Sequence, residues 1–337
     1  MARVGIREVA TLAEVSLGTV SHYINHPSRV SAEKRDRIQK AIDQLGFVRN
    51  NAAWQLRLGR SGTIAYIAPD VSNPFFATIA EGVEQRAATQ DLSVFISNSS
   101  RSRAREDAYL ALFESQQVQG MLVSSHHPID DRLAQIRARG IPSVLIGQLA
   151  THELQPSVSV DDVAGGAMAA SHLIALGRKR LAFVGGPLGI RQVADRLEGA
   201  GSVVKESAGV TLEVLNATNR TIAEGREVGR ALLARPVESR PDAIFAVNDL
   251  LALGILQVLV FGGVTVPGDI ALVGYDDIEF GESSLIPLTS IRAPHEGFGF
   301  AAVDLLVNEM ADEPADLEKH MIFQPELVVR ASTRGPA

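Results

Sequence analysis

The chain opens with a pattern of hydrophobic positions that predicts two short helices joined by a tight turn, over residues 6–25. Small apolar residues recur at helical spacing in the first helix, and Val20 and Ile24 form an i, i+4 pair in the second. Ser16 precedes the second helix and can cap it through its hydroxyl. The pattern leaves four residues facing outward near the start of the second helix: Leu17, Gly18, Ser21 and His22.

A short helix that presents its N-terminal end to solvent is typical of a helix-turn-helix unit, whose second helix reads base edges in the major groove of DNA. An ordinary helical hairpin within a core has the same hydrophobic spacing. The outward face of the second helix and the basic residues around it favour the DNA-binding interpretation.

A third helix is predicted from Ser31, which can cap it, to about Leu45, and Gly46 ends it. Residues 50–58 form a further helix candidate, which is too short to be stable alone in water. Residues 59–62 are predicted to be a linker. Three basic side chains of the third helix are expected either to contact DNA phosphates or to be simply solvated: Arg35, Arg37 and Lys40.

From residue 63 onward, patterns of buried strands alternate with helical patterns. Strands are predicted over residues 63–68, 92–97, 120–124, 142–147, 180–185, 212–215, 243–247 and 270–274. Helices are predicted over residues 75–89, 103–116, 131–139, 164–176, 191–202, 224–233 and 249–261. This alternation predicts parallel sheets covered by helices, in two doubly wound subdomains. Ligands of such sheets bind beyond the carboxyl ends of the strands, so we expect a site in the cleft between the subdomains.

Charge is distributed unevenly along the chain. Residues 1–60 hold ten Lys or Arg and five acidic residues, a net charge of +5, which leaves −12 for the rest of the total of −7. A basic segment before an acidic body indicates one end that binds a polyanion. The absence of cysteine excludes disulfides and thiolate metal sites. Without a long apolar run or a signal-peptide pattern, the sequence favours a cytoplasmic protein that does not enter a membrane.

Two groups of motifs, spread over about residues 5–333, resemble the lactose repressor family of bacterial transcription regulators. The first group consists of Val9-Ala10, Val15-Ser16, Thr19-Val20-Ser21, Asn25, Val30-Ser31, Arg35, Ala41 and Leu45-Gly46-Phe47. The second group comprises residues 70–76, 160–166, 185–187, 196–199, 248–249, 274–277 and 287–291. Any one of these motifs is weak, but the set is specific.

The resemblance implies an α/β protein with an N-terminal helix-turn-helix DNA-binding domain, a hinge helix and a core like that of the periplasmic binding proteins. These three parts correspond to residues 1–49, 50–61 and 62–337. The chain is then expected to cross three times between two subdomains, one formed by about residues 62–161 and 292–321 and the other by about residues 162–290 and 322–333.

The resemblance assigns DNA contacts to the second helix and its surroundings, namely to Ser16, Leu17, Gly18, Thr19, Ser21, His22, Asn25, Ser31 and Arg35. Family members usually carry larger polar residues at some of positions 17, 18 and 22, often Arg at 22. Here Leu17 offers only apolar contact and Gly18 allows close approach, while His22 can donate to N7 or O6 of guanine.

The hinge helix of this family forms only on DNA, pairs with that of a second subunit in the minor groove, and inserts a leucine between base pairs. Leu56 matches this leucine, Ala53 matches the small residue that lets the two helices approach, and Asn50 is a further expected contact. Such a wedge kinks the duplex. Trp54 stands where the family commonly has Arg, and its role remains open between stacking on DNA, contact with the second subunit and core coverage.

Polar residues that follow strand ends can converge on the cleft. Asp70, Asn73 and Phe75 follow the first strand, and by resemblance Arg196, Asn248 and Asp276 match positions that hydrogen-bond the effector. Such groups suit the hydroxyls of a sugar, and an aromatic face suits its C–H side. Further candidates are Ser124, Asp161 and Arg220, the last of which stands where the family has an aromatic residue and so indicates an anionic or phosphorylated ligand.

Other residues near the strand ends have structural explanations. Asp249 and Asp277 are expected to cap helices, as is Asp162. Pro74 and the paired glycines are expected to form turns rather than ligand contacts.

The function predicted from these features is that of a dimeric repressor, released from a palindromic operator by a sugar effector. A nucleoside, purine or sugar-phosphate corepressor is the alternative ligand. We expect no cofactor, because the sequence has no Gly-rich phosphate loop and no metal spacing among its His residues. An enzyme is disfavoured for the same reasons, and a sugar-binding transport component is disfavoured by the basic N-terminal segment.

Overall fold

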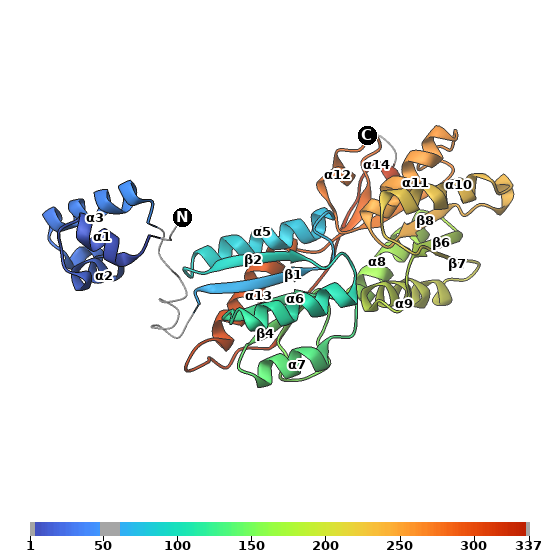
Figure 1. Ribbon diagram of the computed structural model, residues 1–337. Coiled ribbons are helices and arrows are strands. Elements are labelled where there is room, and N and C mark those ends of the chain that lie inside the picture. Colours follow the sequence, from blue (N-terminus) through green and yellow to red (C-terminus); the bar gives the residue numbers. More distant parts are fainter. Residues whose placement is uncertain (1–3, 48–60, 335–337) are drawn as a thin grey trace. The chain divides into compact units, whose positions relative to one another are not determined.

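The computed structural model describes residues 4–47 and 61–334 (Figure 1). The chain divides into two compact units, Met1–Ser61 and Gly62–Ala337, which we call the headpiece and the body. The expected hinge helix, with Asn50, Ala53, Trp54 and Leu56, lies outside the described residues, as does the side chain of Asn25. Within the described parts of the chain, none of the helices has the length and apolar character of a membrane span.

The described part of the headpiece, residues 4–47, contains three α-helices and one 3-10 turn, and it confirms the predicted helix-turn-helix. These elements are α1 (Ile6–Leu12), α2 (Leu17–Asn25), η1 (Pro27–Arg29) and α3 (Ala32–Leu45). Val9, Val20 and Ile38 are fully buried in a small core shared by the three helices. The Ser16 hydroxyl oxygen accepts a hydrogen bond of 3.1 Å from the backbone N–H of Thr19, so Ser16 caps α2 as predicted.

The third helix begins differently from the prediction. Ser31 occupies the N-cap position of α3, but its side chain makes no capping hydrogen bond. The prediction for the other end is confirmed, because Gly46 ends the helix in a left-handed conformation with φ of 60°. Arg37 donates to the backbone oxygens of Ala13 at 2.6 Å and Glu14 at 2.9 Å. It therefore ties α3 to the C-terminal end of α1, which gives this residue a structural role.

The body contains two six-stranded sheets, as expected for two doubly wound subdomains (Figure 1). The strand order of the first sheet is β11-β5-β4-β3-β1-β2. Its strands are β1 (Thr63–Ala68), β2 (Ser93–Asn98), β3 (Gly120–Ser124), β4 (Ser143–Ile146), β5 (Ser157–Val160) and β11 (His320–Phe323). The helices that cover it are α5 (Pro74–Ala88), α6 (Arg103–Ser115), α7 (Asp130–Ala138) and α13 (His295–Glu309). The first sheet is parallel throughout.

The second sheet has the order β12-β10-β9-β8-β6-β7, and only the pairing of β10 with β12 is antiparallel among its described strands. Its strands are β6 (Arg180–Gly185), β7 (Thr211–Asn216), β8 (Ala243–Ala246), β9 (Ala271–Tyr275), β10 (Thr289–Arg292) and β12 (Glu326–Val328). Its helical elements are α8 (Asp162–Ala175), α9 (Arg191–Glu206), α10 (Ile222–Leu233), η2 (Val237–Ser239), α11 (Asp249–Phe261), α12 (Glu279–Glu282) and α14 (Ala331–Arg334).

The chain passes from one sheet to the other three times: between β5 and α8, between β10 and α13, and between β11 and β12. The hydrophobic pattern of the sequence did not single out β5, β10, β11 and β12 as strands. These strands are only three or four residues long. A segment of that length gives only a weak period. β4 and β8 are equally short, but they were predicted because they are runs of mainly apolar residues.

Glycines allow α8 and α9 to approach each other closely. A Cβ atom on Gly199 of α9 would lie 1.9 Å from the backbone oxygen of Val163 in α8, and one on Gly166 of α8 would lie 2.0 Å from the backbone oxygen of Arg196 in α9. Neither position therefore accommodates a larger residue without separation of the helices. This contact brings Arg196 of α9 beside Asp162, the first residue of α8.

We predict that Gly199→Ala destabilises the body by at least about 2 kcal/mol, because the added methyl overlaps the backbone of α8. Gly201→Ala is the matched control on the same helix, since a Cβ atom there has no neighbouring atom within 4 Å. It is expected to leave stability unchanged or to raise it by up to about 1 kcal/mol. Urea unfolding of the two variants checks this, and equal effects would contradict the packing argument.

Candidate functional site

A cavity in the body lies where the carboxyl ends of the strands of both sheets meet, the place expected for parallel sheets. Its volume is about 60 Å³. Seven of the nine predicted effector residues line it: Asn73, Phe75, Ser124, Arg196, Arg220, Asn248 and Asp276. The other two predicted residues, Asp70 and Asp161, do not line the cavity. We call this space the inner cavity.

Arg196 is the central charged group of the inner cavity, and it is 8% exposed. Its Nε donates to Oδ1 of Asp162 at 2.7 Å and its Nη1 donates to the backbone oxygen of Val247 at 2.5 Å. Nη1 also lies 3.8 Å from Oδ1 of Asp276. The guanidinium carbon stands 3.4 Å from the ring centroid of Tyr275, a cation–π contact. Burial by itself lowers the pKa of Arg196, but Asp162, Tyr275 and Asp276 raise it overall, so this side chain stays charged.

Asp276 follows β9 and is almost fully buried. Burial raises the pKa of its carboxyl to about 7, because the stabilising charge of Arg196 does not offset the desolvation and the nearby negative charge of Asp162. Its backbone has a φ of 97°, a conformation that is rare for residues other than glycine. The backbone N–H donates to the oxygen of Ile291 in β10 at 2.9 Å. Asp276 is thus held between the cavity and a strand that connects the two subdomains.

The structure exchanges the roles predicted for the two neighbouring aspartates at the start of α8. Asp161, predicted to contact the effector, accepts a hydrogen bond of 2.8 Å from the backbone N–H of Ala164 and caps α8. Asp162, predicted to be a cap, is buried, lines the cavity and binds Arg196. The N-cap residue must face back toward its helix, so the carboxylate one position later is the one that reaches Arg196.

Asp70 is the other predicted effector residue that lies away from the inner cavity. Its Oδ1 accepts from the hydroxyl of Ser72 at 2.6 Å and from the backbone N–H of Ser72 at 3.1 Å. Its Oδ2 lies 3.9 Å from Nε of Arg101. Asp70 therefore stabilises the loop after β1, where a short polar side chain commonly bonds to the backbone two residues on.

The neutral polar residues of the cavity are themselves held by the fold. Asn73 caps α5 by accepting from the backbone N–H of Phe75 at 3.1 Å, and Asn248 caps α11 by accepting from that of Leu251, also at 3.1 Å. The Asn248 amide nitrogen donates to the backbone oxygen of Arg220 at 3.2 Å. The Ser124 hydroxyl lies 3.1 Å from that of Tyr66. These bonds fix the direction of each group before any ligand binds.

The lining residues that were not predicted as effector contacts include His126, Asp162 and Gln192. His126 follows β3, and its position after a strand end is the signal that could have identified it. Gln192 lies in the first turn of α9, where its amide nitrogen donates to the oxygen of Gly147 at 2.8 Å. Its amide oxygen is buried without a protein partner, and so offers an acceptor to a bound group.

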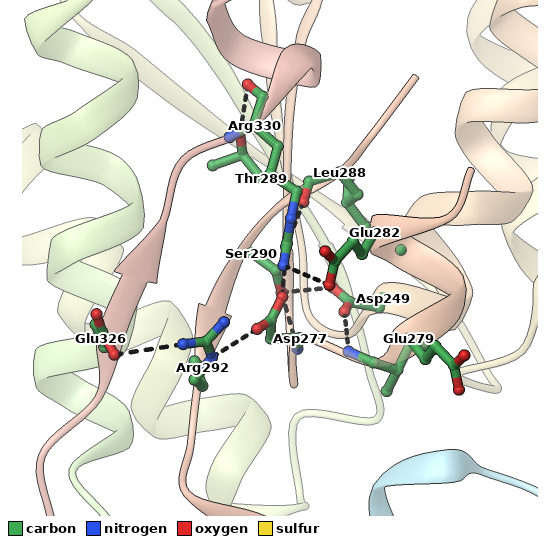
Figure 2. A network of polar contacts seen from close by, with 12 residues as sticks. Asp249, Asp277, Glu279, Glu282, Leu288, Thr289, Ser290, Arg292, Glu326 and Arg330 are labelled. Carbon is green, nitrogen blue, oxygen red and sulfur yellow. Dashed lines mark hydrogen bonds and ion pairs between the residues drawn. The ribbon is translucent and has the colours of Figure 1, made fainter. Parts of the chain in front are cut away.

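A polar network around Asp277, shown in Figure 2, joins the loop after β9 to the connecting segments. Asp277 accepts from Nε of Arg292 in β10 at 2.7 Å and from Nη1 of Arg330, beyond β12, at 2.5 Å. The expectation that Asp277 caps a helix is therefore wrong. Asp277, which follows Asp276 in the chain, thus binds two of the segments that pass between the subdomains.

Asp249 is the fully buried carboxyl of this network (Figure 2). Its Oδ1 accepts from the hydroxyl of Ser290 at 2.7 Å and its Oδ2 accepts from the backbone N–H of Ile278 at 2.8 Å. It does not cap its own helix, contrary to the prediction. Burial and the nearby charge of Asp276 raise its pKa well above the ordinary value, which favours the neutral form.

The headpiece presents several of the predicted DNA contacts to solvent. Leu17 is 46% exposed, and Gly18 and His22 are exposed beside it on α2. Ser16, Ser31 and Arg35 are exposed, while Ser21 and Thr19 are half-buried. The Thr19 hydroxyl lies 2.8 Å from that of Ser16, within the cap of α2. Across the described parts of the chain, no cluster of three or more His, Asp or Glu side chains could hold a metal ion.

We predict that Asp276→Asn becomes more stable relative to the wild type as the pH rises. The folded-state pKa of about 7 exceeds the ordinary value of 3.8, so the folded wild type binds more protons than the unfolded chain between these values and loses stability as the pH rises through them. An amide does not ionise, and Asn tolerates the positive φ. Urea unfolding at pH 5 and pH 8 should show a relative gain of about 3 kcal/mol for the variant.

The control for this prediction is Asp107→Asn, which replaces an exposed carboxylate on α6. Its stability should run parallel to that of the wild type across the same pH range. A parallel course for Asp276→Asn as well would show that burial does not govern the ionisation of this carboxyl.

Comparison with known proteins agrees with both units. Residues 5–50 match the family described as bacterial regulatory proteins, lacI family, and residues 170–333 match the periplasmic binding protein-like domain. The ribose operon repressor of Halalkalibacterium halodurans is 31% identical over 332 residues, which cover 98% of this chain and 97% of that protein.

Two solved structures are similar over nearly the whole chain. The lac repressor dimer bound to operator and an anti-inducer has a TM-score of 0.84 and 25% identity, covering 98% of this chain and 99% of that one. The complex of the transcriptional regulator CelR with cellobiose has a TM-score of 0.70 and 31% identity, covering 98% and 100%. With a full-length relative above 30% identity and a matching headpiece and body, the chain belongs to the lacI family of bacterial regulatory proteins.

Proposed function

We propose that this protein is a ligand-responsive repressor that binds a palindromic operator as a homodimer. The observation that carries the proposal is the combination, in one chain, of a helix-turn-helix headpiece and a two-subdomain body with a buried polar cavity. The similarity to the lac repressor dimer on its operator supports it. The relatives are transcription regulators, so we propose that the chain acts by binding rather than by catalysis, and in the cytoplasm, where its DNA target lies.

We propose that the DNA contacts come from exposed residues of α2 and α3 and from the hinge residues Asn50, Ala53 and Leu56. Leu17, Gly18 and His22 are exposed on the second helix of the helix-turn-helix, which supports a role in base reading. Arg35 is exposed on α3, which supports phosphate contact. A leucine wedge from each hinge would kink the operator, and the additional contacts to the bent duplex would offset the cost of unstacking the base pairs.

The effector proposed for the inner cavity is a sugar. Asp276, Asn248 and Arg196 supply acceptors and donors for vicinal hydroxyls, and Phe75 supplies an apolar face. The ribose operon repressor and the cellobiose complex among the similar proteins support this ligand class. A nucleoside or purine corepressor is the alternative, because the same groups also hydrogen-bond a ribose and a base.

Effector binding is proposed to change the angle between the subdomains. A cavity of about 60 Å³ holds only a few water molecules, so a sugar enters after the lining side chains or the subdomains move apart. The network around Asp277 would carry such a movement into β10 and Arg330. The energy available for the response is limited to the difference in affinity of the effector for the two conformations.

We predict that the full-length protein selects a two-fold symmetric duplex from a random pool. His22→Ala should relax the preference at one base position in each half-site by about 1–3 kcal/mol. Arg35→Gln should weaken binding to every sequence equally and lower the slope of affinity against salt concentration by about one unit per subunit.

Arg226→Gln, which removes an equal charge from an exposed position on α10, serves as the control and should leave both properties unchanged. Selection of no common sequence by the wild type would refute the proposed function. If His22→Ala keeps the wild-type base preferences, the base-reading role of His22 is wrong.

We predict that a cognate sugar raises the unfolding temperature of the protein and that Asp276→Asn abolishes the shift. At 100 times its dissociation constant, a ligand adds about 2.7 kcal/mol to the stability of the folded state. The variant keeps the shape of the side chain but removes its negative charge and replaces one acceptor oxygen with an NH2 donor. Thermal unfolding with a panel of neutral sugars, nucleosides and purines makes the measurement, and Asp107→Asn should retain the shift. A shift given only by nucleosides or purines would select the alternative.

A further inference from the structure

A second space adjoins the inner cavity at Arg220 and His126, which line both. This second space has a volume of about 380 Å³ and shares Ile190, His126 and Arg220 with the inner cavity. We call it the outer hollow. Its remaining walls come from the loops after β2, β3, β6 and β7, and so from both subdomains. Arg220 and His126 therefore face two neighbouring spaces.

Arg220 brings a positive charge to this junction without a carboxylate partner. Its Nη1 donates to the backbone oxygen of Gly186 at 3.2 Å, and its Nη2 lies 3.1 Å from Nδ1 and 3.2 Å from Nε2 of His126. Burial and the charge of Arg220 lower the pKa of His126 well below its ordinary value, so His126 is neutral. Among the described residues, no Asp or Glu forms an ion pair with Arg220. A partly buried guanidinium bonded only to neutral groups retains its full charge for a ligand.

Arg101 adds a second positive charge to the outer hollow, from the loop after β2. Its Nη1 donates to the side-chain oxygen of Asn219 at 3.4 Å, a contact between the two subdomains. The carboxylate that faces it is that of Asp70, at 3.9 Å, a longer separation than the 2.7 Å between Arg196 and Asp162. The Arg101 side chain is 36% exposed, so it remains accessible from the hollow.

The charge balance of the cleft is consequently positive at its outer end. Arg196 is neutralised by Asp162 and Asp276, but Arg220 is not. Burial, followed by the positive charges of Arg196 and Arg101, lowers the pKa of Arg220 to about 10, and the more weakly acting charges of Asp276 and Asp70 do not offset this. An anion placed between Arg220 and Arg101 would remove this repulsion and would receive donors from two guanidinium groups.

We propose that the effector is an anionic polyol, whose carboxylate or phosphate binds between Arg220 and Arg101 in the outer hollow while its hydroxyls bind Asp276, Asn248 and Arg196. This inference rests on the proposed function, because it assigns a chemical class to the effector of the same cleft. It also adds Arg101 and His126 as specificity-determining residues, neither of which was a sequence-predicted effector contact.

The test compares sugars that differ only in charge on the full-length protein. The probes are glucose, glucuronate and glucose 6-phosphate, then ribose and ribose 5-phosphate, with inorganic phosphate against chloride at equal ionic strength. Dissociation constants are measured by calorimetry. We expect at least one anionic sugar to bind tenfold or more tightly than its neutral parent. Comparison of glucuronate with the sugar phosphates then shows whether the cleft prefers a carboxylate or a phosphate.

Variants of the two cleft arginines test whether these residues cause the preference for an anionic sugar. In Arg220→Gln and Arg101→Gln, the anionic sugar and its parent should bind within about threefold of each other. Arg226→Gln removes an exposed arginine of α10 and should keep the tenfold preference. Two separate cleft variants keep the test valid if Arg220→Gln does not fold.

Either of two results overturns the inference. One is the absence of any charge preference in the wild type, whether both members of each pair bind equally or nothing in the panel, inorganic phosphate included, binds. The other is a preference that persists in both cleft variants. Operator binding measured on the same preparations separates this failure from that of the proposed function, because an operator released by a neutral sugar would refute the anionic class alone.

Discussion

The buried ion pair between Arg196 and Asp162 is the interaction on which the site depends. The guanidinium joins the start of α8 to α9, to the oxygen of Val247 and to the ring of Tyr275, so four segments of one subdomain converge on it. Loss of either partner would leave an uncompensated charge in a buried place. The close approach of the helices at Gly166 and Gly199 is what brings the two residues within hydrogen-bonding distance. Helix packing and ligand-site electrostatics are therefore one constraint in this protein.

The ion pair is also connected to the segments that link the subdomains. Asp276 faces Arg196 on the cavity side, and its neighbour Asp277 holds Arg292 and Arg330. A ligand that changes the position of Asp276 thus acts next to Asp277, which binds Arg292 and Arg330 in the connecting segments. Arg101 and Asn219 form a direct contact between the subdomains at the other end of the cleft. The cleft is bordered by polar contacts at both ends, which gives the subdomains two sets of bonds that a change in their angle must rearrange.

Helices and strands with long hydrophobic runs were predicted more accurately than short strands or the roles of single side chains. The long strands β1, β3 and β6 and the helices after them agree with the predicted ranges within a few residues, because their hydrophobic runs are long and bounded by turn residues. The short strands β10 and β12 mix polar and apolar residues and were not predicted, whereas β4 and β8, which have four residues each, were predicted from their mainly apolar runs. Asn248 and Asp276 could be placed at the cleft because they follow strand ends. Asp161 and Asp162 could not be told apart, since either of two adjacent carboxylates can cap a helix.

The sequence by itself determined the class of fold, the helix-turn-helix and the existence of a polar cleft, because these follow from local periodicity, capping residues and strand ends. Only the tertiary structure decided which polar groups already have partners. Ser31 stands at a helix start without capping it, and Arg37 binds the end of α1. Asp162 pairs with Arg196, while Arg220 contacts His126, 94 residues away, and forms no ion pair with an Asp or Glu of the described parts of the chain. Pairing of this kind depends on which segments the crossovers bring together, and a local pattern of residues contains no record of such contacts.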